Sequence, residues 1–237
     1  MSYESDLQLL TSLLSRVQGE RSPEETARML MTHFGSLHSI AECLPRHDTS
    51  LPLSQNVRML LSMLPGLCRQ LELERMGDRP LLDTLESAAR YAEALYIGVH
   101  YERIYLLCLD QNFRLIRHCQ LGEGSVREVP FYPRRILQEA LGCNAQAVIL
   151  CHNHLSGWCF FSEADLASTK EFLRLCTYIQ LPLLDHLLVA DRQVSSMRSK
   201  THIPDADWRA SSPLMPPLNQ WRAGHAAGRI EFLPGVP

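Results

Sequence analysis

The spacing of apolar residues changes near residue 80, and this change limits the folds open to the chain. Before it, apolar side chains recur every three or four positions, as at Leu7, Leu10 and Leu14, which is typical of amphipathic helices. A longer helix in this region contains Pro65-Gly66, where we expect a kink or a break because proline cannot donate a backbone hydrogen bond. The sequence predicts a small helical domain over residues 1–79.

After residue 80 the pattern becomes a mixture of strands and helices. Ile104–Leu109 and Leu115–Leu121 are rich in β-forming residues and predict a hairpin, and the wholly apolar run Ala147–Cys151 predicts a buried central strand. Helices are expected over residues 83–95, 133–143 and 162–178, and two final strands over 183–190 and 194–197. This order predicts an α/β (α+β) domain over residues 80–203.

The last segment, residues 204–237, has prolines at 204, 213, 216, 217, 234 and 237 and no sustained apolar period. This composition predicts a flexible Pro-rich tail. At the other end, Glu4 and Asp6 stand where a signal peptide needs basic residues, and no apolar run approaches the ~18 residues of a membrane span. We therefore expect a cytoplasmic protein with no membrane association.

The charge of the chain disfavours direct DNA binding. The 26 acidic and 23 basic residues give a net charge of −3, and residues 1–100 alone carry −4. A protein that holds a polyanion needs a positive field, which this composition does not supply globally. Eight cysteines are present, but no two stand in Cys-x-x-Cys spacing, so reduced core thiols are favoured over a disulfide framework or a zinc knuckle.

One loop concentrates residues that bind metals. His152 and His154 leave the end of the predicted central strand, and the two-residue period of a strand sends both imidazoles to the same side. Asp165 lies one turn into the helix that begins at Ser162. Two imidazoles and one carboxylate leave the fourth tetrahedral position of Zn²⁺ open, which is the arrangement of a catalytic zinc site. Ser162-x-x-Asp165 is also a helix capping box, and the two roles are compatible.

The pattern His152-x-His154, seven residues, Ser162, two residues, Asp165 resembles the signature of the JAMM (MPN+/JAB) metalloprotease fold. Three supporting runs resemble its RadC (UPF0758) branch more narrowly: Tyr132-Pro133-Arg134-Arg135-Ile136, Ala147-Val148-Ile149-Leu150-Cys151-His152-Asn153-His154, and Leu184-Asp185-His186-Leu187-Leu188-Val189. The resemblance covers about residues 80 to 200. It implies a mixed sheet with flanking helices.

The resemblance also implies the chemistry. It implies a zinc ion held by His152, His154 and Asp165, with a bound water attacking an amide or isopeptide bond of a peptide or protein substrate. Glu102 matches the family's general base and Ser162 matches the serine that stabilises the oxyanion. The alternative for Glu102 is a solvated residue at a strand end. His186 stands among leucines and is expected to support a ligand or the core rather than to bind metal.

The chain departs from the RadC pattern in the metal-binding loop. Leu155, Trp158, Cys159 and Phe161 replace residues that are usually proline or aspartate there, which makes the loop apolar. The segment Trp158–Phe161 either contacts a substrate or protein partner or folds onto the domain as core. Cys159 as a competing metal ligand is a further, weaker alternative.

A second departure lies in the helical domain. RadC proteins commonly carry a helix-hairpin-helix-like domain, and Phe34-Gly35-Ser36-Leu37 matches its framework. The glycine-rich hairpin that would contact a DNA backbone corresponds here to residues 49–54, which contain no glycine. We expect a degenerate domain used for packing or for contact with a protein partner.

Two functions from different classes therefore stand beside each other. The first is a zinc-dependent hydrolase of the JAMM type. The second is a DNA-repair or recombination accessory protein whose metal site is structural or vestigial. An HNH nuclease, suggested by the letters His152-Asn153-His154, is disfavoured because the residues of such nucleases are spread over a ββα element.

Overall fold

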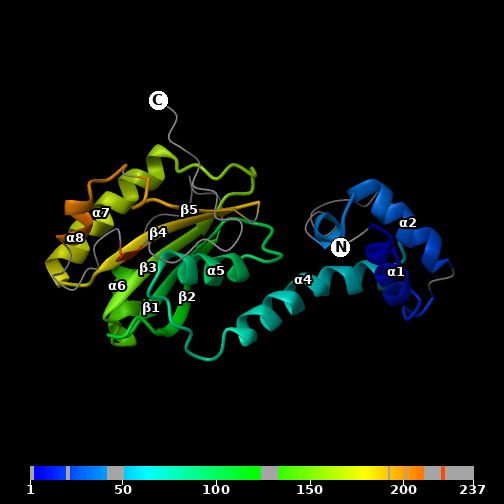
Figure 1. Ribbon diagram of the computed structural model, residues 1–237, viewed down its shortest axis with the longest axis horizontal. Coiled ribbons are helices and arrows are strands. Elements are labelled where there is room, and N and C mark those ends of the chain that lie inside the picture. The colour runs from blue at the N-terminus through cyan, green and yellow to red at the C-terminus, as the bar shows by residue number, and fades with distance from the viewer. Residues whose placement is uncertain are drawn as a thin grey trace. The chain divides into compact units, whose positions relative to one another are not determined.

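The computed structural model describes residues 3–19, 22–41, 51–123, 133–191, 193–200, 202–210 and 220–221. The chain divides into two compact units (Figure 1). One unit comprises Met1–Glu72 with Ile97–His100, and the other comprises Leu73–Tyr96 with Tyr101–Pro237. The first is helical, and the second contains the sheet and the candidate metal ligands.

The helical unit is built from α1 (Tyr3–Leu14), α2 (Pro23–Phe34) and α4 (Gln55–Arg75), the last of which extends past the unit boundary. One apolar face of each helix turns inward because the apolar residues recur at helical spacing. The shared core consists of Leu10, Leu14, Ala27, Leu30, Met31, Ile40, Val57 and Leu61. Of the predicted hairpin segment, residues 49 and 50 lie outside the described part of the chain.

The helix α4 continues through Pro65, so of the kink or break predicted at Pro65-Gly66 the break is wrong. Proline removes one backbone hydrogen bond, but Pro65 is buried and its ring packs against the backbone of Gly98. A Cβ atom at Gly98 would lie 2.1 Å from Cβ of Pro65, so only glycine permits this approach. Arg69 adds a hydrogen bond from Nη1 to the Ile97 carbonyl, at 2.9 Å. These contacts hold the helix where local propensity favours its interruption.

The second unit is built on a five-stranded mixed sheet, which confirms the predicted α/β class. The strands are β1 (Arg103–Leu109), β2 (Leu115–Glu123), β3 (Ala147–Asn153), β4 (Leu183–Ala190) and β5 (Gln193–Ser196), in the spatial order β2-β1-β3-β4-β5. Only β3 and β4 run parallel, and all other neighbours are antiparallel. The predicted hairpin is formed by β1 and β2, and the predicted apolar strand β3 occupies the centre.

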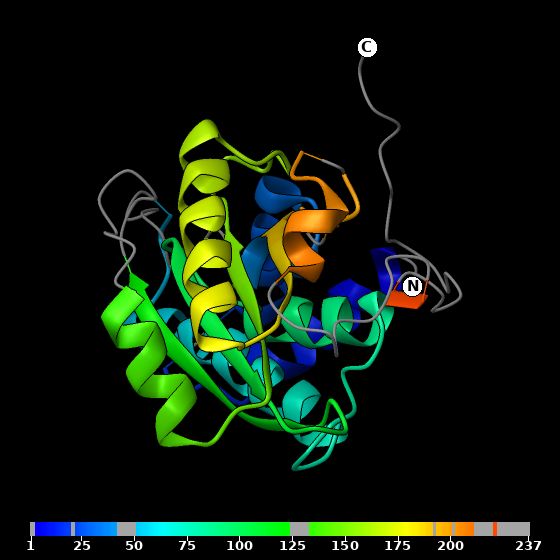
Figure 2. The same cartoon turned by 90° about the vertical axis from the view of Figure 1, so that its left-hand side faces the viewer.

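Helices α5 (Leu85–Leu95), α6 (Pro133–Gly142) and α7 (Glu163–Ile179) flank the sheet. Figure 2 shows α6 and α7 on the side of the sheet that faces the viewer, and α7 is the crossover that joins the parallel strands β3 and β4. Every residue of β3 and β4 is buried, which explains why both strands read as near-continuous apolar runs. The carboxyl end of β3 and the amino end of α7 bring the candidate ligands together.

Part of the segment predicted as a flexible tail is folded. Residues Asp205–Arg209 form the short helix α8, and the indole of Trp208 is fully buried. Trp221 is also fully buried, and its Nε1 donates to Oδ2 of Asp185 in β4, at 2.8 Å. Burial of two indoles outweighs the local tendency of a proline-rich segment to stay extended. Residues 211–219 and 222–237 lie outside the described chain.

Asp185 is a buried centre of hydrogen bonds that the sequence does not reveal. Its Oδ1 accepts from the backbone N–H groups of His186 and Arg198, and its Oδ2 accepts from Ser196 Oγ and Trp221 Nε1. Burial raises the pKa of Asp185, although these four hydrogen bonds oppose the shift. The carboxyl group thus ties β4, β5 and the C-terminal segment together.

Two further observations bear on the predictions from composition. The seven cysteines of the described chain are all free thiols, and Cys108, Cys151, Cys159 and Cys176 are buried. Within the described residues, no helix has both the length and the apolar character needed to cross a membrane.

Candidate metal centre

His152 and His154 reach the site from the end of the central strand. His152 is the sixth residue of β3 and is almost completely buried, whereas His154 follows the strand and is the more exposed of the two. The backbone N–H of His154 donates to the Val189 carbonyl of β4, at 3.0 Å. Since the two residues are separated by one position in extended chain, their imidazoles share a side of the sheet, as predicted.

Asp165 reaches the site from the first turn of α7. Ser162 is the N-cap of this helix: its Oγ accepts from the Asp165 N–H at 3.1 Å, and Asp165 Oδ2 accepts from the Ser162 N–H at 2.7 Å. This reciprocal capping box fixes the carboxylate of Asp165 relative to the helix. The capping box predicted from Ser162-x-x-Asp165 is therefore confirmed.

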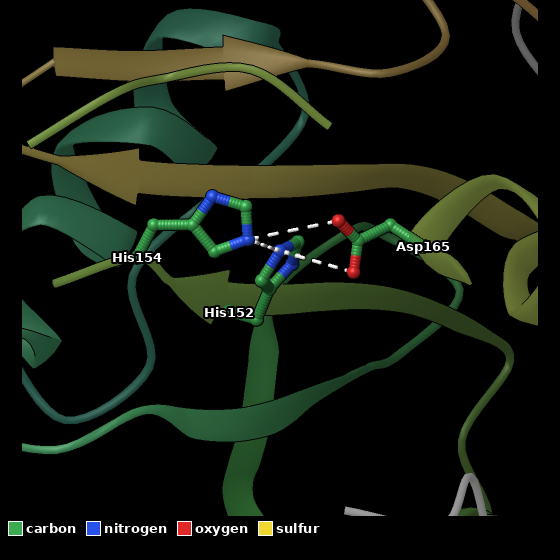
Figure 3. Close-up of side chains that lie close together, drawn as sticks. All are labelled: His152, His154 and Asp165. Carbon is green, nitrogen blue, oxygen red and sulfur yellow. Dashed lines mark hydrogen bonds and ion pairs between the residues drawn. The ribbon is translucent and has the colours of Figure 1, made fainter. Parts of the chain in front are cut away.

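Figure 3 shows the three side chains converging. His152 Nε2 lies 3.5 Å from Asp165 Oδ1, His154 Nε2 lies 3.6 Å from Asp165 Oδ2, and the two Nε2 atoms are 3.1 Å apart. One ligand atom from each residue lies within 4.8 Å of the others. The three residues that the sequence predicts as metal ligands are thus brought together, and this group could hold a metal ion.

A chain of hydrogen bonds behind His152 determines which of its nitrogens is free to bind a metal. Thr169 in α7 has one hydroxyl hydrogen, and it is donated to the Asp165 carbonyl at 2.7 Å. The contact of 2.6 Å between Thr169 Oγ1 and His186 Nδ1 therefore requires an N–H on His186. Burial lowers the pKa of His186 well below its ordinary value, so this ring is neutral and its Nε2 is an acceptor.

The acceptor Nε2 of His186 lies 2.8 Å from Nδ1 of His152, which must then carry the hydrogen. The remaining nitrogen of a neutral His152, Nε2, presents a lone pair to His154 and Asp165. A lone pair on imidazole and a carboxylate oxygen only 3.5 Å apart are two acceptors, and they need a cation or a proton between them. The donor set, two nitrogens and one oxygen at a partly exposed position, fits Zn²⁺ with an open coordination position.

The electrostatics of the cluster favour a negative carboxylate. Burial alone would raise the pKa of Asp165, but the neighbouring imidazoles of His152 and His154 and the hydrogen bond from Ser162 hold this pKa well below its ordinary value. The hydrogen bond with Asp165 raises the pKa of His154, burial opposes this shift, and the charges of Asp165 and Glu102 add to it. Asp165 is therefore ionised, and His154 binds a proton more readily than an ordinary histidine does.

Glu102 lies just before β1 and is close enough to His154 for its charge to act on that imidazole. The register of the antiparallel pair β1–β3 places Ile104 opposite His152. Continued by two residues, it places Glu102 opposite His154, on the same face as both imidazoles. The carboxylate is half-buried, and its charge contributes to the raised pKa of His154.

Ser162 contacts the cluster through Asp165. Its hydroxyl donates to Asp165 Oδ2 at 2.7 Å, and it also accepts from the Asp165 N–H. The single hydroxyl hydrogen is thus directed at the carboxylate. Stabilisation of an oxyanion by Ser162 would require this hydrogen to turn away from Asp165.

The loop between the ligands is anchored on alternate residues. Cys159 is buried, and its thiol donates to the Leu188 carbonyl at 3.4 Å and lies 3.6 Å from the Gln193 carbonyl. The Phe161 ring packs on the imidazoles of His152 and His186, with centroids 5.9 and 5.6 Å apart. Cys159 packs in a small core with Leu188 and Ala190, and it is not one of the three clustered ligands. This position argues against Cys159 as a competing metal ligand.

Trp158 and Phe160 alternate with these anchors and face solvent, with 69% and 48% of their surface exposed. The two rings lie 6.5 Å apart, and Lys200 Nζ lies 5.2 Å from the centre of the Phe160 ring. The alternative in which the segment Trp158–Phe161 folds onto the domain as core is thus correct for Cys159 and Phe161 only. One half of it is core, and the other half is an exposed aromatic surface beside the metal cluster.

Sequence reasoning missed Thr169 and the structural part played by Asn153. Thr169 lies four residues after Asp165, so a helical wheel places the two on one face, but nothing in the sequence points it at His186. Asn153 alternates with the two histidines, and the two-residue period of a strand directs its side chain to the opposite side. Its carboxamide bonds the backbone on both sides of Glu102.

Comparison with known proteins identifies relatives of this chain. The family model described as RadC-like JAB domain matches residues 82–202. A UPF0758 protein of Shewanella oneidensis is 31% identical over 201 residues, which cover 84% of this chain and 89% of the relative. A UPF0758 protein of Shewanella sp. strain MR-4 has the same identity and coverage. The resemblance seen in the sequence is confirmed, and the chain belongs to the family of RadC-like JAB-domain proteins.

Proposed function

We propose that this protein is a zinc-dependent hydrolase of amide or isopeptide bonds. The observation that carries the proposal is the cluster of His152, His154 and Asp165, whose ligand atoms lie within 4.8 Å of one another. Three protein ligands leave room for a fourth, which distinguishes a hydrolytic from a structural zinc site. A zinc ion held there would act as a Lewis acid and supply a nucleophile at neutral pH.

Each residue of the cluster has a task in such a reaction. His152, oriented by His186, offers Nε2, and Asp165 offers a carboxylate that is ionised throughout the neutral range. Glu102, which is opposite His154 when the β1–β3 register is continued by two residues, is the general base: it accepts the proton of the attacking water, then returns it to the leaving amine. Ser162 donates its hydroxyl hydrogen to the developing oxyanion once that hydrogen leaves Asp165.

The substrate in this proposal is a polypeptide that contacts the aromatic pair Trp158 and Phe160. The pair is held in place by the buried Cys159 and the partly buried Phe161, and the latter packs directly on His152. Rigid exposed aromatic rings bind apolar side chains at small entropic cost, which is why tryptophan is enriched in interfaces. A bulky apolar residue near the scissile bond is therefore the favoured substrate feature.

The test begins with metal analysis and ends with turnover. The purified protein is expected to bind one zinc per chain and to hydrolyse members of a peptide and isopeptide library. His154→Ala should lose zinc and hydrolysis together, whereas Glu102→Gln should retain zinc and lose hydrolysis by about 10²–10⁴-fold, the usual contribution of a general base. His33→Ala, in the helical unit, is the control.

One set of results would contradict the enzyme. Stoichiometric zinc without hydrolysis of any amide or isopeptide substrate would leave the metal centre and remove the proposed reaction. Binding of duplex DNA at near-physiological salt by the same preparation would then favour the alternative, an accessory protein of DNA repair or recombination.

A further inference from the structure

Asn153 stands between the two histidine ligands in the chain but is engaged elsewhere. It is the last residue of β3 and is only 5% exposed. Its Oδ1 accepts from the backbone N–H of Arg103 at 2.8 Å, and its Nδ2 donates to the carbonyl of Tyr101 at 3.3 Å. One partner requires an acceptor and the other a donor, so the two contacts together use the carboxamide as only Asn or Gln can.

These two backbone groups flank Glu102. The Tyr101 carbonyl belongs to the peptide bond before Glu102, and the Arg103 N–H belongs to the peptide bond after it. Peptide groups are planar, so holding both of them restricts the φ and ψ angles of the residue between them. The ladder between β1 and β3 ends at the pair Ile104–His152, and beyond this pair the Asn153 side chain provides the hydrogen bonds.

The backbone direction of Glu102 decides where its carboxylate lies. In the continued register Glu102 is opposite His154, and cross-strand neighbours have Cβ atoms about 4.5–5.5 Å apart. Strand ends fray more readily than strand centres, and on the β3 side this end of β1 has no ladder bonds, although Arg103 still pairs with Glu123 of β2. Asn153 supplies hydrogen bonds to the backbone on the β3 side, where fraying would move Glu102 away from the metal ligands.

We infer that Asn153 is a positioning residue, which holds the backbone on both sides of Glu102 so that its carboxylate faces the metal centre. The inference rests on the proposed function, since it assigns Glu102 the role of general base. It gives the central residue of His152-Asn153-His154 a task separate from metal binding. It also explains why a buried amide is placed at this strand end.

The first experiment measures the contact itself in the full-length protein. Amide hydrogen exchange is followed for Arg103 and, as internal references, for Leu106 and Leu107 in the same strand. In Asn153→Leu the Arg103 amide should exchange at least about tenfold faster, with the reference amides unchanged. Asn153→Ala is the second variant, in case the leucine side chain is not accommodated. Unchanged exchange of Arg103 in the folded variants would overturn the inference.

The second experiment measures the effect on the metal centre without turnover. The Co²⁺-substituted protein is compared with Glu102→Gln and Asn153→Leu by visible absorption, which reports on groups beside the open coordination position. Both variants should change the spectrum in the same direction while metal affinity stays within about threefold of wild type. Thr84→Ala is the control for a general loss of hydrogen bonds, because it removes the capping box of α5 and leaves Asn153 and Glu102 unchanged.

The outcomes separate the positioning role from its alternatives. A large loss of metal affinity in Asn153→Leu would mean that the residue acts on His152 or His154 instead. A spectrum altered by Glu102→Gln but not by Asn153→Leu, or by neither variant, would also refute the inference. The matching change in both, with normal metal affinity, supports it.

Kinetics complete the test if the protein hydrolyses a substrate. Asn153→Leu should lower kcat with little change in KM, and it should have little further effect in a Glu102→Gln background, because the two residues act as a unit. Additive losses would overturn the inference. If the wild-type protein hydrolyses nothing, the proposed function fails, whereas the exchange and Co²⁺ results still decide the part of Asn153.

Discussion

His186 Nε2 lies 2.8 Å from His152 Nδ1, so a metal ligand on one strand is oriented by a buried imidazole on the next. In the parallel pair β3–β4, His186 of β4 is paired with Leu150 of β3, and Leu150 lies two residues before His152. Burial keeps His186 neutral by lowering its pKa, and Thr169 directs its hydrogen. The orientation of the ligand thus depends on α7 as well as on both strands.

Removing the hydroxyl at residue 169 should weaken metal binding. Thr169→Val keeps the shape of the side chain but leaves the His186 Nδ1–H without its acceptor, so the tautomer that exposes His152 Nε2 is no longer favoured. We expect zinc affinity to fall by about 10–100-fold, the usual effect of losing a group that orients a ligand. Competition with a chelator measures it. Thr169→Ser, which keeps the hydroxyl, should bind zinc normally, and equal loss in both variants would contradict the relay.

Zinc affinity should fall as the pH decreases through neutrality. The bond with Asp165 raises the pKa of His154 above the ordinary value of 6.5, so protons compete for this ligand at a higher pH than usual. The lowered pKa of Asp165 keeps the carboxylate ionised, so it does not limit binding in this range. Below the His154 pKa, affinity should drop by about tenfold per pH unit for each proton displaced. Calorimetry at several pH values measures the slope, and retention of full affinity well below pH 5 would exclude imidazole ligation.

Trp158 should report substrate binding by fluorescence. Of the three tryptophans, Trp208 and Trp221 are fully buried and Trp158 is exposed, so a quencher dissolved in water should act mainly on Trp158. Peptides with a bulky apolar residue should protect this emission, and Trp158→Ala should weaken their binding by about 1–3 kcal/mol, as for an aromatic interface residue. Leu9→Ala, an exposed apolar residue of α1, is the control. Equal affinity for apolar and polar peptides would contradict the proposed contact.

Loss of the indole N–H at residue 221 should destabilise the sheet unit. In Trp221→Phe, Oδ2 of the buried Asp185 loses one of its two donors. The free energy of unfolding should fall by about 1–3 kcal/mol, the cost of leaving a buried polar group unsatisfied together with the lost packing. Urea denaturation measures the change. Truncation after residue 210 should have at least as large an effect, and a truncated protein of unchanged stability would mean that the C-terminal segment only rests on the fold.

Addition of one methyl group at residue 98 should destabilise the helical unit. Gly98 has a φ of +66°, and a Cβ there would lie 2.1 Å from Cβ of Pro65. Gly98→Ala should therefore lower the free energy of unfolding by about 2–4 kcal/mol, from left-handed backbone strain and from overpacking. Gly77→Ala has a positive φ and no atom within 4 Å of its Cβ, so it isolates the backbone cost. Equal losses in the two variants would show that the contact with Pro65 is unimportant.

Local patterns determined much of the sheet unit. The wholly apolar run Ala147–Cys151 could be satisfied only by burial on both faces, and it became the central strand β3. The spacing of His152, His154 and Asp165 was also sufficient, because a two-residue period and one helical turn are short-range geometry. The capping signal at Ser162 is equally local and was likewise readable.

Other features arise from contacts between residues far apart in the chain, and the sequence could not reveal them. Pro65 remains within a helix because it packs on Gly98, and the tryptophans of the proline-rich segment are buried, one of them on Asp185. In each case, contacts with a residue far away in the sequence stabilise the observed conformation by more free energy than the local propensity disfavours it. No periodicity encodes such a pairing.

The sequence by itself thus determined the class of fold, the family and the three residues able to hold a metal. Only the tertiary structure decided how those residues are oriented: His186 and Thr169 direct the lone pair of His152, and Asn153 holds the backbone beside Glu102. The physical reason is the sequence distance between the residues that interact. Ligand spacing is set within one turn or one strand, whereas the direction of a lone pair or a carboxylate is set by hydrogen bonds from neighbouring elements, which come together only when the sheet is assembled.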